Sequence, residues 1–346
     1  MDLKEGSLGA KLFTELKKDY KPNGEETFSL TLTKKALTEN MQKDDACFEA
    51  CAVILKSLGW NVCLKLDKKA EKYLSGFEKE IDDLNTNIGN EHIREKIFSS
   101  EKRHCLRFLY RLYRFKEQYS WLGIDEELSS LFEKFLKALK EKRIRLINNA
   151  PTRNAKTNPE YPESMVEALM ADHKNNVFWV ALNGKPNDQE IGRQLPVGLY
   201  LGDHTKGKEF FPTGRIDLWT GNKEKIQVVE LKIKNPMIGI ITEIFFYSNF
   251  MYDLTRGIFK FNESNPELRG YSHLKDISKN VPEITGVMLA DRYHPLLEDE
   301  ESQKAILRVM NGSDKIQYSM ASYKFKEEKN GITIRKGNFS AFLKKV

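Results

Sequence analysis

The most constraining feature of this sequence is a short apolar run that carries two charges. Residues 226–233 read IQVVELKI, so apolar side chains fall on both faces of any strand that they form. Such a run is typical of a central strand that is covered on both sides. Glu230 and Lys232 point to the same face of this strand, because strand side chains alternate. Burying both charges costs on the order of several kcal/mol unless a partner compensates.

A second strand is predicted immediately before this run. Residues 214–219 read GRIDLW, and the turn at 220–225 contains the Gly and Asn that tight turns favour. A hairpin of the two strands brings Asp217 beside Glu230, with Lys232 one step away. A divalent cation between these carboxylates would compensate the buried charge, and their hard oxygen ligands suit Mg²⁺ or Mn²⁺ rather than zinc.

A simpler interpretation of these charges is an ion pair between Glu230 and Lys232, with Asp217 nearby by chance. Two observations favour the metal site. Both acids stand late in their strand patterns, and a glycine turn joins the strands.

The elements around the hairpin predict a mixed α/β domain over residues 151–346. Its expected order is a helix, a series of strands, a helix and a strand. The predicted helices cover 162–173, 237–257 and 298–310, and the predicted strands cover 177–182, 195–201, 214–219, 226–232, 284–290, 316–325 and 331–335.

Asp217 followed by Glu230-Leu231-Lys232 resembles the bipartite PD-(D/E)xK motif of the restriction-endonuclease-like nucleases. The resemblance covers residues 162–290, about a third of the chain. It implies an α/β fold with a restriction-endonuclease-like mixed sheet core flanked by helices. Ile216 stands where the family has a proline before the first acid.

The resemblance also implies a ligand set. Besides Asp217 and Glu230, the family uses a backbone carbonyl, which here belongs to Leu231, and a glutamate on the preceding helix. Glu163 and Glu167 both stand on that helix, one turn apart. Glu163 is favoured because its place at the helix start resembles archaeal Holliday-junction resolvases.

In this family the lysine of the motif orients the attacking water or stabilises the transition state, which gives Lys232 that role. Arg215 is a candidate for binding a substrate phosphate, or for balancing the acids. Lys234 would extend the positive charge at the edge of the predicted site. RecB-type members carry Gln-x-x-x-Tyr on the next helix, and residues 243–247, EIFFY, match it at Tyr247, which could equally be a core aromatic.

Residues 1–150 are predicted to form a separate, mainly helical domain. The boundary is the segment 149–162, NAPTRNAKTNPEYP, which is rich in proline and asparagine and poor in large aliphatic residues. Strands are expected at 28–33 and 60–66, with a helix at 44–58 between them. This domain would select the substrate, bind a protein partner or a second copy of the chain, or hold the enzyme inactive.

A predicted helix at 101–119 carries Arg107, Arg111 and Arg114 on one face, at positions i, i+4 and i+7. One interpretation is a ridge that binds substrate phosphates. The other is an ordinary solvated helix face.

The net charge, the length of the apolar segments and the cysteine spacing are consistent with these expectations. The net charge of +6 suits a partner with phosphates without demanding one. No segment approaches the ~20 apolar residues that span a bilayer. The four cysteines contain no Cys-x-x-Cys pair, so they predict reduced thiols rather than a zinc site, as in a cytoplasmic protein.

The sequence as a whole predicts a Mg²⁺-dependent deoxyribonuclease that hydrolyses phosphodiester bonds in defence, restriction or repair. The alternative is a nuclease-like fold that no longer cuts and instead binds nucleic acid or a protein partner.

Overall fold

The computed structural model describes residues 5–9, 11–12, 26–86, 99–126, 128–130, 146–172, 191–201, 209–212, 214–264, 266–278, 281, 283–328, 331–336 and 339–344. These residues form a mixed α/β structure with two main sheets. The predicted strand at 177–182 lies outside them.

The N-terminal part is built on a four-stranded parallel sheet in the order β1-β2-β3-β4. Its strands are β1 (Glu5–Ser7), β2 (Thr27–Leu32), β3 (Asn61–Leu66) and β4 (Leu122–Ile124). The helices between them are α2 (Lys34–Thr38), α3 (Phe48–Ser57), α4 (Lys68–Thr86) and α6 (Ser100–Gln118).

The helices of the N-terminal part pack with a parallel sheet, which contains two strands besides the two that the sequence predicts. The strands predicted at 28–33 and 60–66 are confirmed as β2 and β3. The outer strands, β1 and β4, are three residues long, too short for an alternating pattern to reveal them.

The C-terminal part contains a five-stranded sheet in the order β11-β10-β9-β8-β6. Strands β6, β8 and β9 run antiparallel as a meander, whereas β9, β10 and β11 run parallel. The strands are β6 (Ile191–Pro196), β8 (Arg215–Gly221), β9 (Lys225–Lys232), β10 (Glu283–Ala290) and β11 (Gln317–Ser322). Since β9 is buried from Ile226 to Lys232, the predicted central strand is confirmed.

The helices of this part are α8 (Pro162–Met170), α10 (Ile240–Thr255), α11 (Tyr271–Ile277) and α12 (Glu300–Met310), with short 3₁₀ turns η1 (Leu268–Gly270) and η2 (Pro295–Leu297). A separate three-stranded antiparallel sheet contains β12 (Lys324–Glu328), β13 (Gly331–Lys336) and β14 (Phe339–Lys344). Strand β5 (Leu146–Asn148) pairs with β7 (Leu199–Leu201), so residues before 150 already belong to the C-terminal part.

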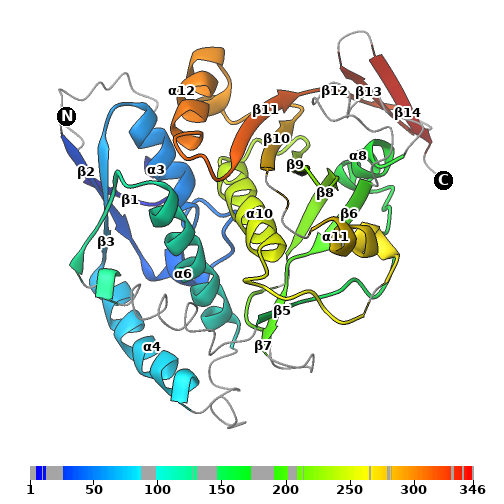
Figure 1. Ribbon diagram of the computed structural model, residues 1–346. Coiled ribbons are helices and arrows are strands. Elements are labelled where there is room, and N and C mark those ends of the chain that lie inside the picture. Colours follow the sequence, from blue (N-terminus) through cyan, green and yellow to red (C-terminus); the bar gives the residue numbers. More distant parts are fainter. Residues whose placement is uncertain are drawn as a thin grey trace.

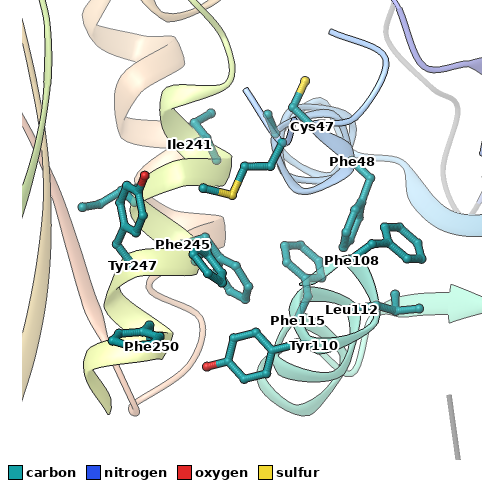
Figure 2. Packing of buried hydrophobic residues seen from close by; sticks show 14 of the residues in the cluster. Cys47, Phe48, Phe108, Tyr110, Leu112, Phe115, Ile241, Phe245, Tyr247 and Phe250 are labelled. Atoms are coloured by element: carbon teal, nitrogen blue, oxygen red, sulfur yellow. The ribbon is translucent and has the colours of Figure 1, made fainter. Parts of the chain in front are cut away.

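Helix α10 lies between the N-terminal and C-terminal parts and contacts both (Figure 1). It packs against β9 and β10 on one side and against α3 on the other. Phe245 points toward Phe115 of α6, and Tyr247 lies on another side of α10 (Figure 2). Every residue of α10 except Tyr252 is buried, as expected for a helix that is covered all round.

Helix α8 covers the other face of the five-stranded sheet. It contacts β9, β13 and β14, and its buried residues join Leu218, Val229 and Leu231 in a second apolar core. Among the described helices, none combines the length and the hydropathy needed to cross a bilayer.

The packing of α10 on β10 predicts a steric requirement at Gly286. A Cβ added there would lie 2.5 Å from Ser248 Oγ and 2.9 Å from Ile244 Cγ1. We expect Gly286→Ala to lower the free energy of unfolding by about 1 to 3 kcal/mol, because an overpacked core must shift. Denaturant unfolding followed by circular dichroism measures this change.

The matched control is Gly76→Ala in α4, where an added Cβ meets nothing within 4 Å. It should leave stability unchanged or raise it by up to about 1 kcal/mol, because alanine favours a helix over glycine. Equal effects of the two substitutions would contradict the close approach of α10 to β10.

Candidate metal centre

The ends of β8 and β9 separate at the predicted site. Their ladder of paired residues ends at Leu218 and Val229, so Asp217 and Glu230 would form the next pair. At this point the Asp217 side chain replaces backbone pairing, because its Oδ2 accepts a hydrogen bond of 2.8 Å from the Leu231 amide. The carboxylate is thereby fixed at the mouth of the hairpin.

Three carboxylates converge beside this opening. Glu163 and Glu167 stand one turn apart on α8, and one oxygen from each lies within 4.8 Å of the other and of an Asp217 oxygen. Three hard oxygen donors at this spacing can hold a divalent cation such as Mg²⁺ or Mn²⁺. The structure thus brings Asp217 together with both glutamates that the sequence left as alternatives.

The two glutamates differ in their surroundings. Glu167 is buried and accepts hydrogen bonds from Gln194 Nε2 at 2.9 Å and Arg193 Nη2 at 3.4 Å. Glu163 has no such bond among the described side chains, and it lines a cavity. Glu163 is therefore the more available of the two for an added ligand.

Lys232 lies at the centre of a buried ion-pair network. Its Nζ is 2.5 Å from Glu230 Oε1 and 2.9 Å from Glu243 Oε2. The side chains of Glu230, Lys232 and Glu243 are 2%, 6% and 1% exposed. Gln42 of the N-terminal part donates a hydrogen bond to the second oxygen of Glu243.

This network alters the expected role of Glu230. The sequence paired Glu230 with Asp217 as metal ligands, but Glu230 is outside the group of converging oxygens. Its Oε1 binds Lys232, and its Oε2 is buried without a hydrogen-bond partner among the described residues. The Leu231 carbonyl stays a prediction as a ligand.

Glu243 is a site residue that the sequence argument missed. In the sequence it stands where RecB-type members have glutamine. The available signal was its position, since it is an acid in the first turn of a mostly apolar helix.

The carboxylates in this region resist ionisation. Burial, followed by the charges of Glu167 and Glu243, raises the pKa of Glu163 to about 7, although Lys232 opposes this shift. Burial also raises the pKa values of Asp217 and Glu230 well above their usual range. Burial lowers the pKa of Lys232, but the surrounding carboxylates outweigh it, so the net shift is upward. A bound cation would counter both the burial and the mutual repulsion of these carboxylates, and so favour their ionised forms.

A cavity of about 510 Å³ opens onto these residues, and we call it the interdomain cavity. Both parts of the chain line it: Asn40, Met41, Gln42, His104 and Arg107 from the N-terminal part, and Glu163, Pro212, Gly214, Arg215, Asp217, Glu230, Lys232, Glu243 and Tyr247 from the C-terminal part. Its size is that of a small-molecule binding site.

The residues predicted to bind substrate differ in their position relative to the interdomain cavity. Arg215 is exposed at the cavity, where its Nη1 donates to Gln194 Oε1 at 3.4 Å. Tyr247 lines the cavity, and its pKa is raised well above the usual range by burial and then by Glu230. Lys234 lies outside the cavity lining and pairs with Glu327 at 2.9 Å.

The predicted arginine ridge is not formed, which corrects both interpretations of that helix face. Arg111 and Arg114 are buried and paired with Glu49 and Asp253, respectively. They connect elements within the protein rather than face a substrate. Of the three arginines, Arg107 alone lines the interdomain cavity.

Comparison of the chain with protein families, curated proteins and solved structures finds no match.

The raised pKa of Glu163 predicts a stability that depends on pH. Between its ordinary pKa of 4.5 and its folded value of about 7, the folded protein holds a proton that the unfolded chain has released. The metal-free protein should therefore lose stability as pH rises through this window. Unfolding temperatures measured in EDTA between pH 5 and pH 8 test this expectation.

Two comparisons make this test specific. Glu163→Gln should flatten the pH dependence, whereas Glu283→Gln, at an exposed site paired with Lys225, should leave it unchanged. Mg²⁺ should raise the unfolding temperature more at pH 8 than at pH 5. Identical slopes for the parent and Glu163→Gln would refute the shift.

The arginine contacts predict a structural role for Arg111. Its Nε and Nη2 contact the two Glu49 oxygens at 2.6 and 2.5 Å. Arg111→Met should cost on the order of 3 to 5 kcal/mol, because it leaves a buried carboxylate without its partner. Combining it with Glu49→Met should recover much of that loss in chemical denaturation, and failure of the double variant to improve on the single one would contradict this role.

Proposed function

We propose that this chain is a Mg²⁺- or Mn²⁺-dependent nuclease that hydrolyses phosphodiester bonds, with DNA as its substrate. The proposal depends on one observation. Oxygens of Glu163, Glu167 and Asp217 lie within 4.8 Å of one another, and Glu163 and Asp217 line a cavity that Lys232 also lines.

The order of elements supports this proposal. Helix α8, the meander β6-β8-β9, helix α10 and the parallel strand β10 occur in this order along the chain, with β7 inserted before β8 and α11 inserted before β10. This order agrees with the helix, strands, helix and strand of the restriction-endonuclease-like nucleases. We therefore propose that α8 to β10 form a core of that kind, with the N-terminal part added to it.

The donor set fits a hard divalent cation. Its members are carboxylates with raised pKa values, and Glu230 Oε2 is buried without a hydrogen-bond partner in the described structure. Glu163, Glu167 and Asp217 would hold the ion, with Glu230 at its edge. When bound, the ion would lower the pKa of a water and neutralise charge on the phosphate.

The chain's own residues supply the remaining functions. Lys232 is held as an ammonium by Glu230 and Glu243, so its N–H groups can orient a water or stabilise the charge of the transition state. The Leu231 amide holds the Asp217 carboxylate in one orientation. Arg215, exposed at the cavity, can bind a phosphate of the substrate.

A group of arginines beside the carboxylates favours a polyanionic substrate. Burial, and then the positive charges of Arg215, Arg153 and Arg193, lower the pKa of Arg269, so these three guanidinium groups lie near that of Arg269. Polyanions such as nucleic acids stabilise such a cluster by neutralising it. The buried free thiols of Cys47 and Cys51 suit the reducing cytoplasm in which we place the protein.

One observation favours a second candidate, a fold of this kind that binds nucleic acid without cutting it. Lys232 already has two carboxylate partners, as it would in a purely structural ion-pair network. Metal binding separates the candidates, because only a nuclease requires the cation for its activity.

The decisive test is cleavage of plasmid DNA, linear DNA and RNA by the purified protein in Mg²⁺, in Mn²⁺ and in EDTA. Asp217→Asn and Lys232→Met should each lower the cleavage rate by roughly 10²- to 10³-fold, because each removes a group that acts on the developing charge. Calorimetry should show that Asp217→Asn also loses Mn²⁺ binding.

Glu283→Gln is the matched control, since it removes a carboxylate from an exposed ion pair on the same sheet. It should cleave at the parent rate. DNA binding without metal-dependent cleavage by the parent would favour the second candidate, and Asp217→Asn cutting as fast as the parent would exclude the assigned centre.

A further inference from the structure

Arg107 is a buried cation that has no carboxylate partner among the residues that the structure describes. Its side chain lies on α6 of the N-terminal part and is 3% exposed. Within the described part of the chain, no carboxylate oxygen lies within 4.0 Å of it. Its Nη2 makes hydrogen bonds with Asn40 Oδ1 at 3.5 Å and His104 Nδ1 at 3.0 Å.

The next arginines on the same helix show what a structural role requires. Arg111 binds both oxygens of Glu49, and Arg114 binds both oxygens of Asp253. Each of these two buried guanidinium groups is thus paired with a carboxylate, which offsets the loss of hydration on burial. Arg107 faces the interdomain cavity instead.

The surroundings of Arg107 hold it in place without neutralising it. His104 has a pKa lowered to about 4 by burial and then by Arg107, so its neutral ring can accept a hydrogen bond from the guanidinium. The Phe246 ring lies 5.8 Å from the guanidinium carbon. Burial and then Arg111 lower the pKa of Arg107 to about 10, although Tyr247, Glu243 and Glu49 oppose this shift. Arg107 therefore stays charged at neutral pH.

The same cavity is lined by this cation and by members of the carboxylate centre. Asp217, Glu163 and Lys232 line the same space as Arg107. A guanidinium presents two parallel N–H groups that match the oxygens of a phosphate. A metal-bound phosphodiester at the carboxylates would therefore lie within a cavity whose N-terminal side carries an unneutralised arginine.

We propose that Arg107 binds a phosphate of the nucleic-acid substrate, so that the active site is formed by both parts of the chain. This inference rests on the proposed nuclease function. His104 and Asn40 are positioning residues that orient the guanidinium, and the N-terminal part contributes directly to substrate binding.

The first experiment measures stability and phosphate binding together. Arg107→Met should unfold at the same temperature as the parent or higher, because it replaces an unpaired buried charge with an apolar chain of similar length. Inorganic phosphate should raise the unfolding temperature of the parent and raise that of Arg107→Met less. Lys304→Met, which removes a charge from an exposed pair on α12, should respond to phosphate like the parent.

The second experiment measures the affinity for a short single-stranded DNA by fluorescence anisotropy, with Ca²⁺ in place of Mg²⁺ to limit hydrolysis. Arg107→Met should bind roughly ten- to a hundredfold more weakly. The slope of log affinity against log salt should fall by about 0.7, the value for one lost phosphate contact on a single strand. Arg107→Lys should recover part of the affinity, because it restores the charge without the paired N–H groups.

The outcomes of these experiments test the role of Arg107 separately from the proposed nuclease function. Parent-like DNA affinity, salt slope and phosphate response in Arg107→Met would overturn the role of Arg107, even if the parent cuts DNA. Loss of these responses in a well-folded Arg107→Met supports it. If the parent binds DNA through Arg107 but cleaves nothing in Mg²⁺ or Mn²⁺, the nuclease function fails while the phosphate contact stands.

Discussion

The site depends on an excess of negative charge around one ammonium group. Glu230, Glu243, Asp217 and Glu163 all raise the pKa of Lys232 against the effect of its burial. Burial, and then the neighbouring carboxylates, raise the pKa values of Glu163, Asp217 and Glu230. Burying these ionisable groups costs stability, which the rest of the fold must offset. A bound cation would stabilise the ionised carboxylates more strongly here than at a solvated site, because burial disfavours their charged forms.

Helix α10 makes this cluster possible because it belongs to both parts of the molecule. It covers the sheet that carries Glu230 and Lys232, and it also packs on α3 of the N-terminal part. Its Glu243 contacts Lys232 on one side and Gln42 on the other. The core is consequently continuous across both parts, and the cavity lies where they meet. Substrate selection and catalysis would then share a single surface.

The three arginines on one face of α6 have different surroundings in this structure. Arg111 and Arg114 each meet a buried carboxylate, whereas Arg107 meets a cavity. The spacing predicted correctly that they share a helix face. It could not indicate that the face is buried, because the elements that cover it, α3 and α10, come from distant parts of the sequence. Periodicity reports which side chains share a face, but not what lies opposite.

The sequence by itself predicted the hairpin, the central strand, α8, α10 and β10, because strand alternation, apolar runs and turn residues are local signals. It did not predict α11, and it expected one strand at 195–201 where the structure has the end of β6 and then β7. It also identified Asp217 and Lys232, since charges inside an apolar strand require compensation. Tertiary structure alone decided that Glu167 joins Glu163 and Asp217, that Glu230 pairs with Lys232, and that Glu243 and Arg107 reach the cavity. These outcomes depend on how α8, α10 and α6 pack around the sheet, and such packing is set by contacts between residues far apart in the chain.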